Sequence, residues 1–167
     1  MEIEHIDTFL EYLSRIHQRT DRVVRCIPPD QLEWTYREGK FTLGDVIRHI
    51  ATIERFMFVE TVCGRPSRYA GCGRELADGY EQTLRYVNQL CAESMKILSS
   101  LSDADLQHKC ATPDGAKITV WKWLRAMVEH EIHHRGQLYM YLSLLSVSTP
   151  PLYGLTSEQV RERSVAS

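Results

Sequence analysis

The chain has 167 residues, of which 43% are hydrophobic and 25% are charged, and its formal net charge is −2 at pH 7. This near-neutral balance creates no field that would attract nucleic acid or anionic lipid, so we expect neither as a partner. No apolar run approaches the roughly 18–20 residues that span a bilayer, and the acidic residues 1–5 do not resemble a signal peptide. The sequence therefore predicts a cytoplasmic protein with one domain over residues 1–167.

Apolar residues recur at helical spacing in four long segments. These segments cover approximately residues 3–26, 42–64, 79–100 and 119–145. The prolines at 28–29 stop the first segment, and those at 150–151 stop the last. Thr42 is a suitable N-cap for the second segment, with Asp45 at the third helical position.

Two shorter features complete the pattern. Between the third and fourth segments, Pro113-Asp114-Gly115 is a turn signal flanked by short alternating stretches, which predicts a small hairpin. Residues 156–159 form a capping box for a short terminal helix that ends near Arg163. We therefore expect an all-α four-helix bundle with a hairpin-like insertion before its fourth helix and a short C-terminal helix.

The fourth helical segment carries the most definite chemical signal, in the run from His130 to Gln137. His130 and His134 are four residues apart, which places both imidazoles on one helix face, one turn above the other. Such a pair can bind one transition-metal ion through its ring nitrogens. The same spacing also arises in histidines that hydrogen-bond carbonyls or water, so a third ligand is needed to support a metal site.

His49 is the best candidate for that third ligand. It follows Val46 by three residues and precedes Ile53 by four, so its helix face points to the interior of the bundle. A buried, unpaired imidazole is costly, and convergence with His130 and His134 would give it a partner. Three histidines from two helices would leave a metal position open, as in reactive rather than structural sites.

Other residues near this motif have plainer interpretations. His133 falls about 60° from His130 around the helix and is expected to flank the site. Gln137 is expected either to orient a ligand or to face solvent. Gly136 weakens the helix, which the close approach of another helix would offset. Tyr139 and Tyr141 are expected to serve mainly in packing.

The remaining histidines and cysteines carry weaker signals. We expect His5, His17 and His108 to be ordinary surface or loop residues. The five cysteines are odd in number, include no Cys-x-x-Cys pair and are expected to be reduced. Among them Cys72, between two glycines, is expected to be exposed.

Residues 130–134 also match His-Glu-x-x-His, the zincin pattern in which the glutamate is a general base. On this interpretation Glu131 would serve a metallopeptidase. However, no suitably placed histidine or glutamate follows Gln137 before the helix ends, and strand signals for a peptide-binding sheet edge are minimal.

Taken together, these motifs resemble the DinB-like/YfiT superfamily. The resemblance rests on His49 in a helix opened by residues 41–45, on the downstream His-x-x-x-His-Arg-Gly-Gln, on Trp34, and on residues 153–158. It covers nearly the whole chain. It implies an up-down-down-up bundle, commonly a homodimer, with zinc or nickel held by His49, His130 and His134.

The resemblance also implies a class of activity. Characterised relatives include transferases and isomerases that use low-molecular-weight thiols such as bacillithiol or mycothiol. Our leading hypothesis is therefore a metal-dependent thiol S-transferase that acts on an electrophile. The alternatives are a non-catalytic metal-binding stress-response protein and a metal-dependent hydrolase, which Glu131 facing the metal would favour. Arg65, Arg68 and Arg74 would either meet an anionic thiol or lie in a solvated loop.

Overall fold

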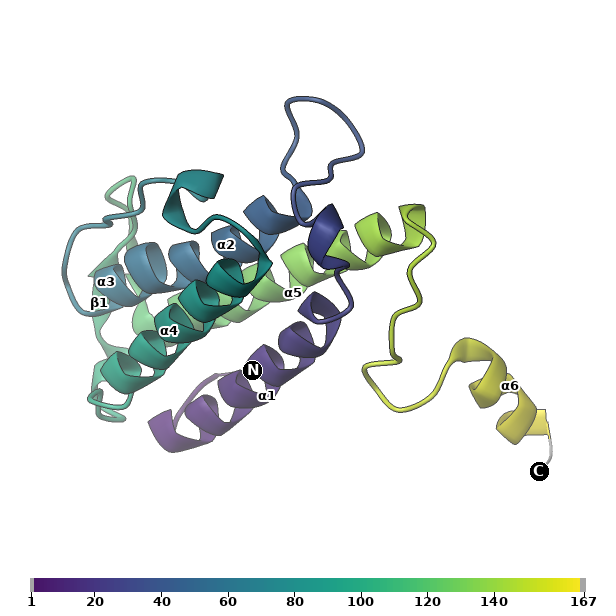
Figure 1. Cartoon of the computed structure of the whole chain (residues 1–167). Helices are drawn as coiled ribbons and strands as arrows, with labels where there is room; N and C mark the ends of the chain where they lie inside the picture. Colours follow the sequence, from purple (N-terminus) through teal and green to yellow (C-terminus); the bar gives the residue numbers. More distant parts are fainter. Residues whose placement is uncertain (1, 166–167) are drawn as a thin grey trace.

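The computed structural model describes residues 2–165, and Figure 1 shows its helices packed as a bundle. The helices are α1 (Ile6–Val24), α2 (Leu43–Ile53), α3 (Val59–Val62), α4 (Tyr80–Leu98), α5 (Val120–Leu144) and α6 (Ser157–Val165). The strands are β1 (Lys109–Ala111) and β2 (Lys117–Thr119). Short 3₁₀ turns are η1 (Pro29–Gln31), η3 (Arg74–Leu76) and η4 (Asp105–Gln107). The predicted four-helix bundle is confirmed.

The second helical segment is one continuous helix in which a π-helical turn separates two α-helical parts. It begins where Thr42 and Asp45 form the expected reciprocal capping box. Between α2 and α3 the residues Glu54–Phe58, labelled η2, wind as a π-helix, which the sequence pattern did not indicate. Such wider turns are rare and occur frequently at functional sites. The turn places Glu54 in the core, 3% exposed.

The long connection after α3 sets the order of the bundle. It leads the chain back along this helical segment, so that α2 and α4 run in the same direction (Figure 1). Helix α2 packs against α4 and α5, and α1 packs against α5. The core has two parts, one around Leu13, Phe58 and Leu124 and the other around Leu43 and Leu142. All five residues are at most 4% exposed, so α1, α2 and α5 are fixed by burial of apolar surface.

The two expected accessory elements are present. Strands β1 and β2 pair antiparallel, with Cys110 opposite Ile118, and Gly115 takes a positive φ of 87° in the turn. Thr156 and Gln159 cap α6 reciprocally. Helix α6 buries none of its residues and projects from the bundle in Figure 1. None of the helices between residues 2 and 165 has the length and apolar character needed to cross a membrane.

Candidate metal centre

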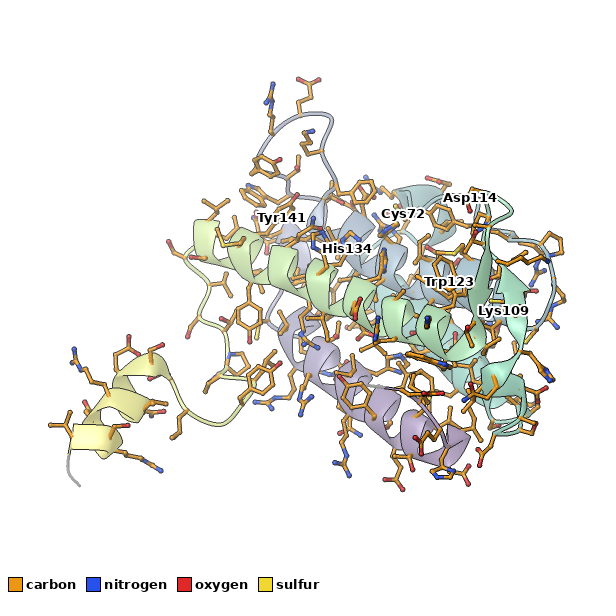
Figure 2. The ribbon with its side chains drawn as sticks, turned by 180° about the vertical axis from the view of Figure 1, so that it is seen from behind. Cys72, Lys109, Asp114, Trp123, His134 and Tyr141 are labelled. Carbon is orange, nitrogen blue, oxygen red and sulfur yellow. The ribbon has the colours of Figure 1, made fainter. Side chains whose placement is uncertain are left out.

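The structure brings together the three histidines that the sequence singled out. His49 comes from the middle of α2, and His130 and His134 come from successive turns of α5. One ring nitrogen of each lies within 4.8 Å of the others. Figure 2 shows His134 projecting from α5, with Tyr141 nearer the C-terminal end of the same helix. Within residues 2–165, no cysteine, aspartate, glutamate or fourth histidine joins this group.

The spacing within the group suits a shared ion. Nε2 of His49 and Nε2 of His130 are 3.2 Å apart. Two nitrogens bound to one tetrahedral zinc at ~2.0–2.1 Å would be separated by about 3.3 Å. The ring centroids of His130 and His134 are 4.4 Å apart, and those of His49 and His134 are 4.6 Å apart. The side chains therefore have a ligand-like arrangement.

Hydrogen bonds to the outer nitrogens orient two of the rings. Nδ1 of His134 donates to Oε1 of Gln137 at 2.7 Å, which leaves the Nε2 lone pair free. Nδ1 of His49 lies 2.8 Å from the hydroxyl of Tyr69. Metal-binding histidines usually have such a partner, because it fixes the tautomer and the ring orientation.

The electrostatic surroundings keep these imidazoles neutral. Burial, together with the neighbouring His134, lowers the pKa of His49 to about 4. Burial and the three nearby histidines lower the pKa of His130 to about 3. Burial also lowers the pKa of His134. A neutral imidazole has the lone pair that a metal requires, so the group is ready for a cation at neutral pH.

Glu131 does not face this group, although it directly follows His130. Its Oε1 accepts a hydrogen bond from the Thr20 hydroxyl at 2.5 Å, and the residue is 3% exposed. Consecutive residues on a helix diverge by about 100°, so the neighbour of a ligand turns into the core. The zincin interpretation fails on this point, because its general base is directed away from the metal position.

Two residues that support the centre were missing from the sequence interpretation. Tyr69 lies in the loop after α3, where no periodicity indicates the direction of a side chain. Arg48 is fully buried and donates to Glu33 and Asp45, and also to the carbonyl oxygen atoms of Cys72 and Ala77 at 2.9 and 3.1 Å. It thus ties the loop that carries Tyr69 to the helix that carries His49.

The same loop contains the three arginines considered for an anionic ligand. Arg65 and Arg68 pair with Glu60 at 2.5 and 2.7 Å, and Arg74 pairs with Asp78 at 2.5 Å. Each is therefore engaged within the chain. The carboxylate of Glu60 is buried, and although burial opposes its ionisation, the arginines lower its pKa to about 2.

Several smaller expectations have definite outcomes. His133 is exposed and flanks the group, 3.3 Å from the Gln137 amide. The Tyr139 hydroxyl donates to the Pro150 carbonyl, and Tyr141 packs against Trp34 and Tyr36. A Cβ at Gly136 would meet no atom within 4 Å, so no other part of the described chain approaches it closely.

Two other expectations from the sequence, the exposure of Cys72 and of His17, were wrong. Cys72 is 7% exposed because its loop is held against α2. The side chain of His17 is only 16% exposed and lies 2.8 Å from a carboxylate oxygen of Glu54. Leu13 and Thr20 precede and follow His17 on the same face of α1, and both are buried. That spacing was the available signal for its burial.

Comparison with known proteins agrees with this architecture. A family model of the DinB superfamily matches residues 12–138. The chain belongs to the DinB superfamily. A curated DinB-type relative, the uncharacterised protein YjoA of Bacillus subtilis strain 168, is 23% identical over 140 residues, which cover 80% of this chain and 86% of YjoA.

Solved structures show the same fold. A DinB-like protein from Bacillus cereus ATCC 10987 has a TM-score of 0.75 and 18% identity, with 89% of this chain and 97% of that chain covered. YfiT from Bacillus subtilis has a TM-score of 0.68 and 18% identity, with 89% and 91% covered. At these identities the similarity establishes a shared bundle architecture.

Proposed function

We propose that this DinB-superfamily protein binds a divalent metal ion through His49, His130 and His134 and uses it to transfer a low-molecular-weight thiol to an electrophile. The observation that carries the proposal is the convergence of three neutral imidazoles with no fourth protein donor in the described chain. Zinc and nickel both suit three imidazole ligands. Two of the three rings also have the outer hydrogen bonds typical of metal ligands.

The residues around the three histidines would have distinct roles in this reaction. When bound, the ion would supply Lewis acidity, which lowers the pKa of a coordinating thiol. Tyr69 and Gln137 would hold their histidines in a fixed orientation. The exposed ring of Phe41, with its centroid 5.3 Å from that of His49, would provide an apolar wall for the electrophile, and Phe58 packs against His130 from the core with centroids 5.9 Å apart.

The direction of the Glu131 side chain favours a thiol over water as the nucleophile. The carboxylate that follows His130 is turned into the core, where Thr20 binds it. A thiol needs only coordination to become a nucleophile, whereas hydrolysis at a metal commonly also relies on a proton-accepting side chain. In the transfer, a carbon–sulfur bond forms, the leaving group departs with its electron pair, and the thiol proton passes to solvent.

Hydrolysis is the second candidate, and a likeness to one relative favours it. YfiT is described as a "probable metal-dependent hydrolase". In this chain the water would occupy the position that we assign to the thiol, with its pKa lowered toward ~7. A third candidate, a metal-binding stress-response protein without turnover, would be favoured by four protein ligands, and the described group contains three.

The experiment that tests the proposal follows loss of free thiol. Bacillithiol, mycothiol and glutathione are each supplied with a chlorinated aromatic electrophile, with and without a chelator, and with zinc or nickel restored. We expect metal-dependent thiol consumption and chloride release, both abolished in His49→Ala and retained in His133→Ala. Rates that are equal after metal removal would contradict it. Metal-dependent ester or amide cleavage without a thiol would support hydrolysis instead.

We also propose that the protein is a homodimer that pairs through α5. Exposed apolar residues recur every fourth position on this helix, with Ile132, Met140 and Leu144 at 37%, 64% and 60% exposure. Gly136 continues this row and would let a second helix approach closely. Light scattering should give twice the chain mass for the wild type and the chain mass for Met140→Glu. A monomeric wild type at micromolar concentration would exclude this interface.

A further inference from the structure

A second group of metal-binding side chains lies inside the bundle, on a different face of α5. It consists of His17 from α1, Glu54 from the π-helical turn and Cys91 from α4, with one donor atom of each within 4.8 Å of the others. Glu131 from α5 lies beside them, its Oε2 3.6 Å from Nε2 of His17. Four elements distant in sequence thus direct nitrogen, oxygen and sulfur donors to one point.

Two carboxylate oxygens in this group have no hydrogen-bond partner within the described chain. They are Oε1 of Glu54 and Oε2 of Glu131, both on residues that are 3% exposed. A buried oxygen without a partner is costly, and native proteins rarely leave one without a water or an ion. These two oxygens lie beside an imidazole and a thiol, so a cation bound there would satisfy both of them.

A cavity of about 250 Å³ gives access to this group. His17, Cys91 and Glu131 line its inner end, and Gln18, Asn88 and other partly exposed residues of α1 and α4 line its outer part. The cavity therefore offers a path from solvent between α1 and α4. It also offers room for water molecules that would complete the coordination of an ion.

The composition His-Glu-Cys also suggests a nucleophilic triad, but the geometry argues against it. Nε2 of His17 lies 2.8 Å from Oε2 of Glu54, so the carboxylate already engages this nitrogen. Burial and the nearby carboxylates raise the pKa of the Cys91 thiol well above 9. A protonated thiol is a poor nucleophile. Metal binding, in contrast, would remove this proton and use the same three donors.

We propose that His17, Glu54 and Cys91 form a second site for a divalent transition-metal ion of the zinc class, with Glu131 as its neighbouring carboxylate. Mixed nitrogen, oxygen and sulfur donors select such an ion over calcium or magnesium, which prefer oxygen alone. The exchange conserves charge, because one dication replaces two protons, one from the His17 imidazolium and one from the Cys91 thiol. This site is independent of the function proposed for the three-histidine centre.

Cobalt(II) distinguishes the two sites, because only the second contains a thiolate. A cobalt–thiolate bond gives a strong near-ultraviolet charge-transfer band that histidine ligands do not give. The purified full chain is titrated with Co²⁺ as wild type and as the variants His49→Ala, Cys91→Ser and Cys72→Ser. We expect the band in the wild type, in His49→Ala and in Cys72→Ser, and its loss in Cys91→Ser.

Two further measurements make the result decisive. Circular dichroism shows that each variant is folded, and Glu54→Gln, which keeps the shape of the side chain, should weaken the cobalt affinity about tenfold or more. Metal analysis should find about one ion per chain in His49→Ala. A wild type without the band, or a band that survives Cys91→Ser, would overturn the proposal. A His49→Ala variant that contains no metal would also overturn the proposal, because the second site should still be occupied in it. That result would leave the case for the three-histidine centre unchanged.

Discussion

The two histidine-containing groups of this bundle differ in what surrounds the imidazoles. In the three-histidine centre the neighbours are other histidines and aromatic rings, and the pKa values of His49 and His130 fall to about 4 and about 3. In the interior group the neighbours are carboxylates. There burial lowers the pKa of His17, but the charges of Glu54 and Glu131 outweigh burial and raise this pKa to about 9.

The difference shows how neighbours determine the chemistry of one residue type. A neutral imidazole offers a lone pair, whereas a protonated imidazole is itself the cation of its group. The first group would therefore accept a metal without losing protons, whereas the second would exchange protons for it. His130 and Glu131 are consecutive in sequence, and the turn of about 100° between them separates the two environments.

The largest expected effect breaks the first group. His130→Ala removes one of three ligands, and we expect metal affinity to fall by at least about a hundredfold and metal-dependent activity to reach the background. Metal analysis of the purified variant checks this. The matched control is His133→Ala, which removes an imidazole from the same helix outside the group. Equal metal content in both variants would refute the assignment of His130.

The next effect breaks the second group. Glu54→Ala removes the carboxylate that contacts His17 at 2.8 Å and leaves a buried cation poorly paired. We expect the unfolding free energy to fall by about 3 kcal/mol, measured by urea denaturation in the presence of a chelator. The control is Glu129→Ala, which breaks an exposed ion pair with Arg125 and should cost less than about 1 kcal/mol. Similar losses in the two variants would argue against a stabilising interior pair.

The pH dependence of stability sharpens the contrast in charge. Because the pKa of His17 is raised from 6.5 to about 9 in the folded state, its protonation stabilises the fold below pH 6.5. This stabilisation is lost as the pH rises through about 9. We expect the difference in unfolding free energy between the wild type and His17→Gln to shrink by on the order of 3 kcal/mol over this range. A difference that stays constant from pH 6 to pH 10 would contradict the raised pKa.

The smallest effect concerns the outer partners of the first group. Tyr69→Phe removes only the hydroxyl that contacts Nδ1 of His49. We expect about a tenfold loss of metal affinity, measured by competition with a chromophoric chelator. Tyr139→Phe is the control, because its hydroxyl donates to the Pro150 carbonyl and should not affect the metal. Unchanged metal affinity in Tyr69→Phe would show that the Tyr69 hydroxyl does not orient His49 for metal binding.

Much of the fold was predictable because it depends on local patterns. Helical periodicity located the long helices within a few residues, and the Thr42–Asp45 box marked the start of α2 as the structure has it. The convergence of His49 with His130 and His134 was also expected, since all three occupy interior-facing positions of long helices. These features follow from spacing along one helix, which the sequence contains directly.

The rest depends on contacts between distant segments. Tyr69 reaches His49 from a loop whose carbonyls Arg48 binds, and no local pattern encodes that contact. The π-helical turn that directs Glu54 into the core has no periodic signature. The burial of His17 could be inferred from its spacing to Leu13 and Thr20, but its two carboxylate neighbours come from other segments, and no local pattern indicates them.

Both groups contain residues from the same two helical segments. Helix α2 and its π-helical continuation carry His49 and Glu54, and α5 carries His130 and Glu131. A movement of α2 and its π-helical continuation relative to the rest of the bundle would thus change the ligand distances within both groups at once. If cations occupy both, their affinities are thermodynamically linked, and by reciprocity each ion alters the binding of the other by the same factor.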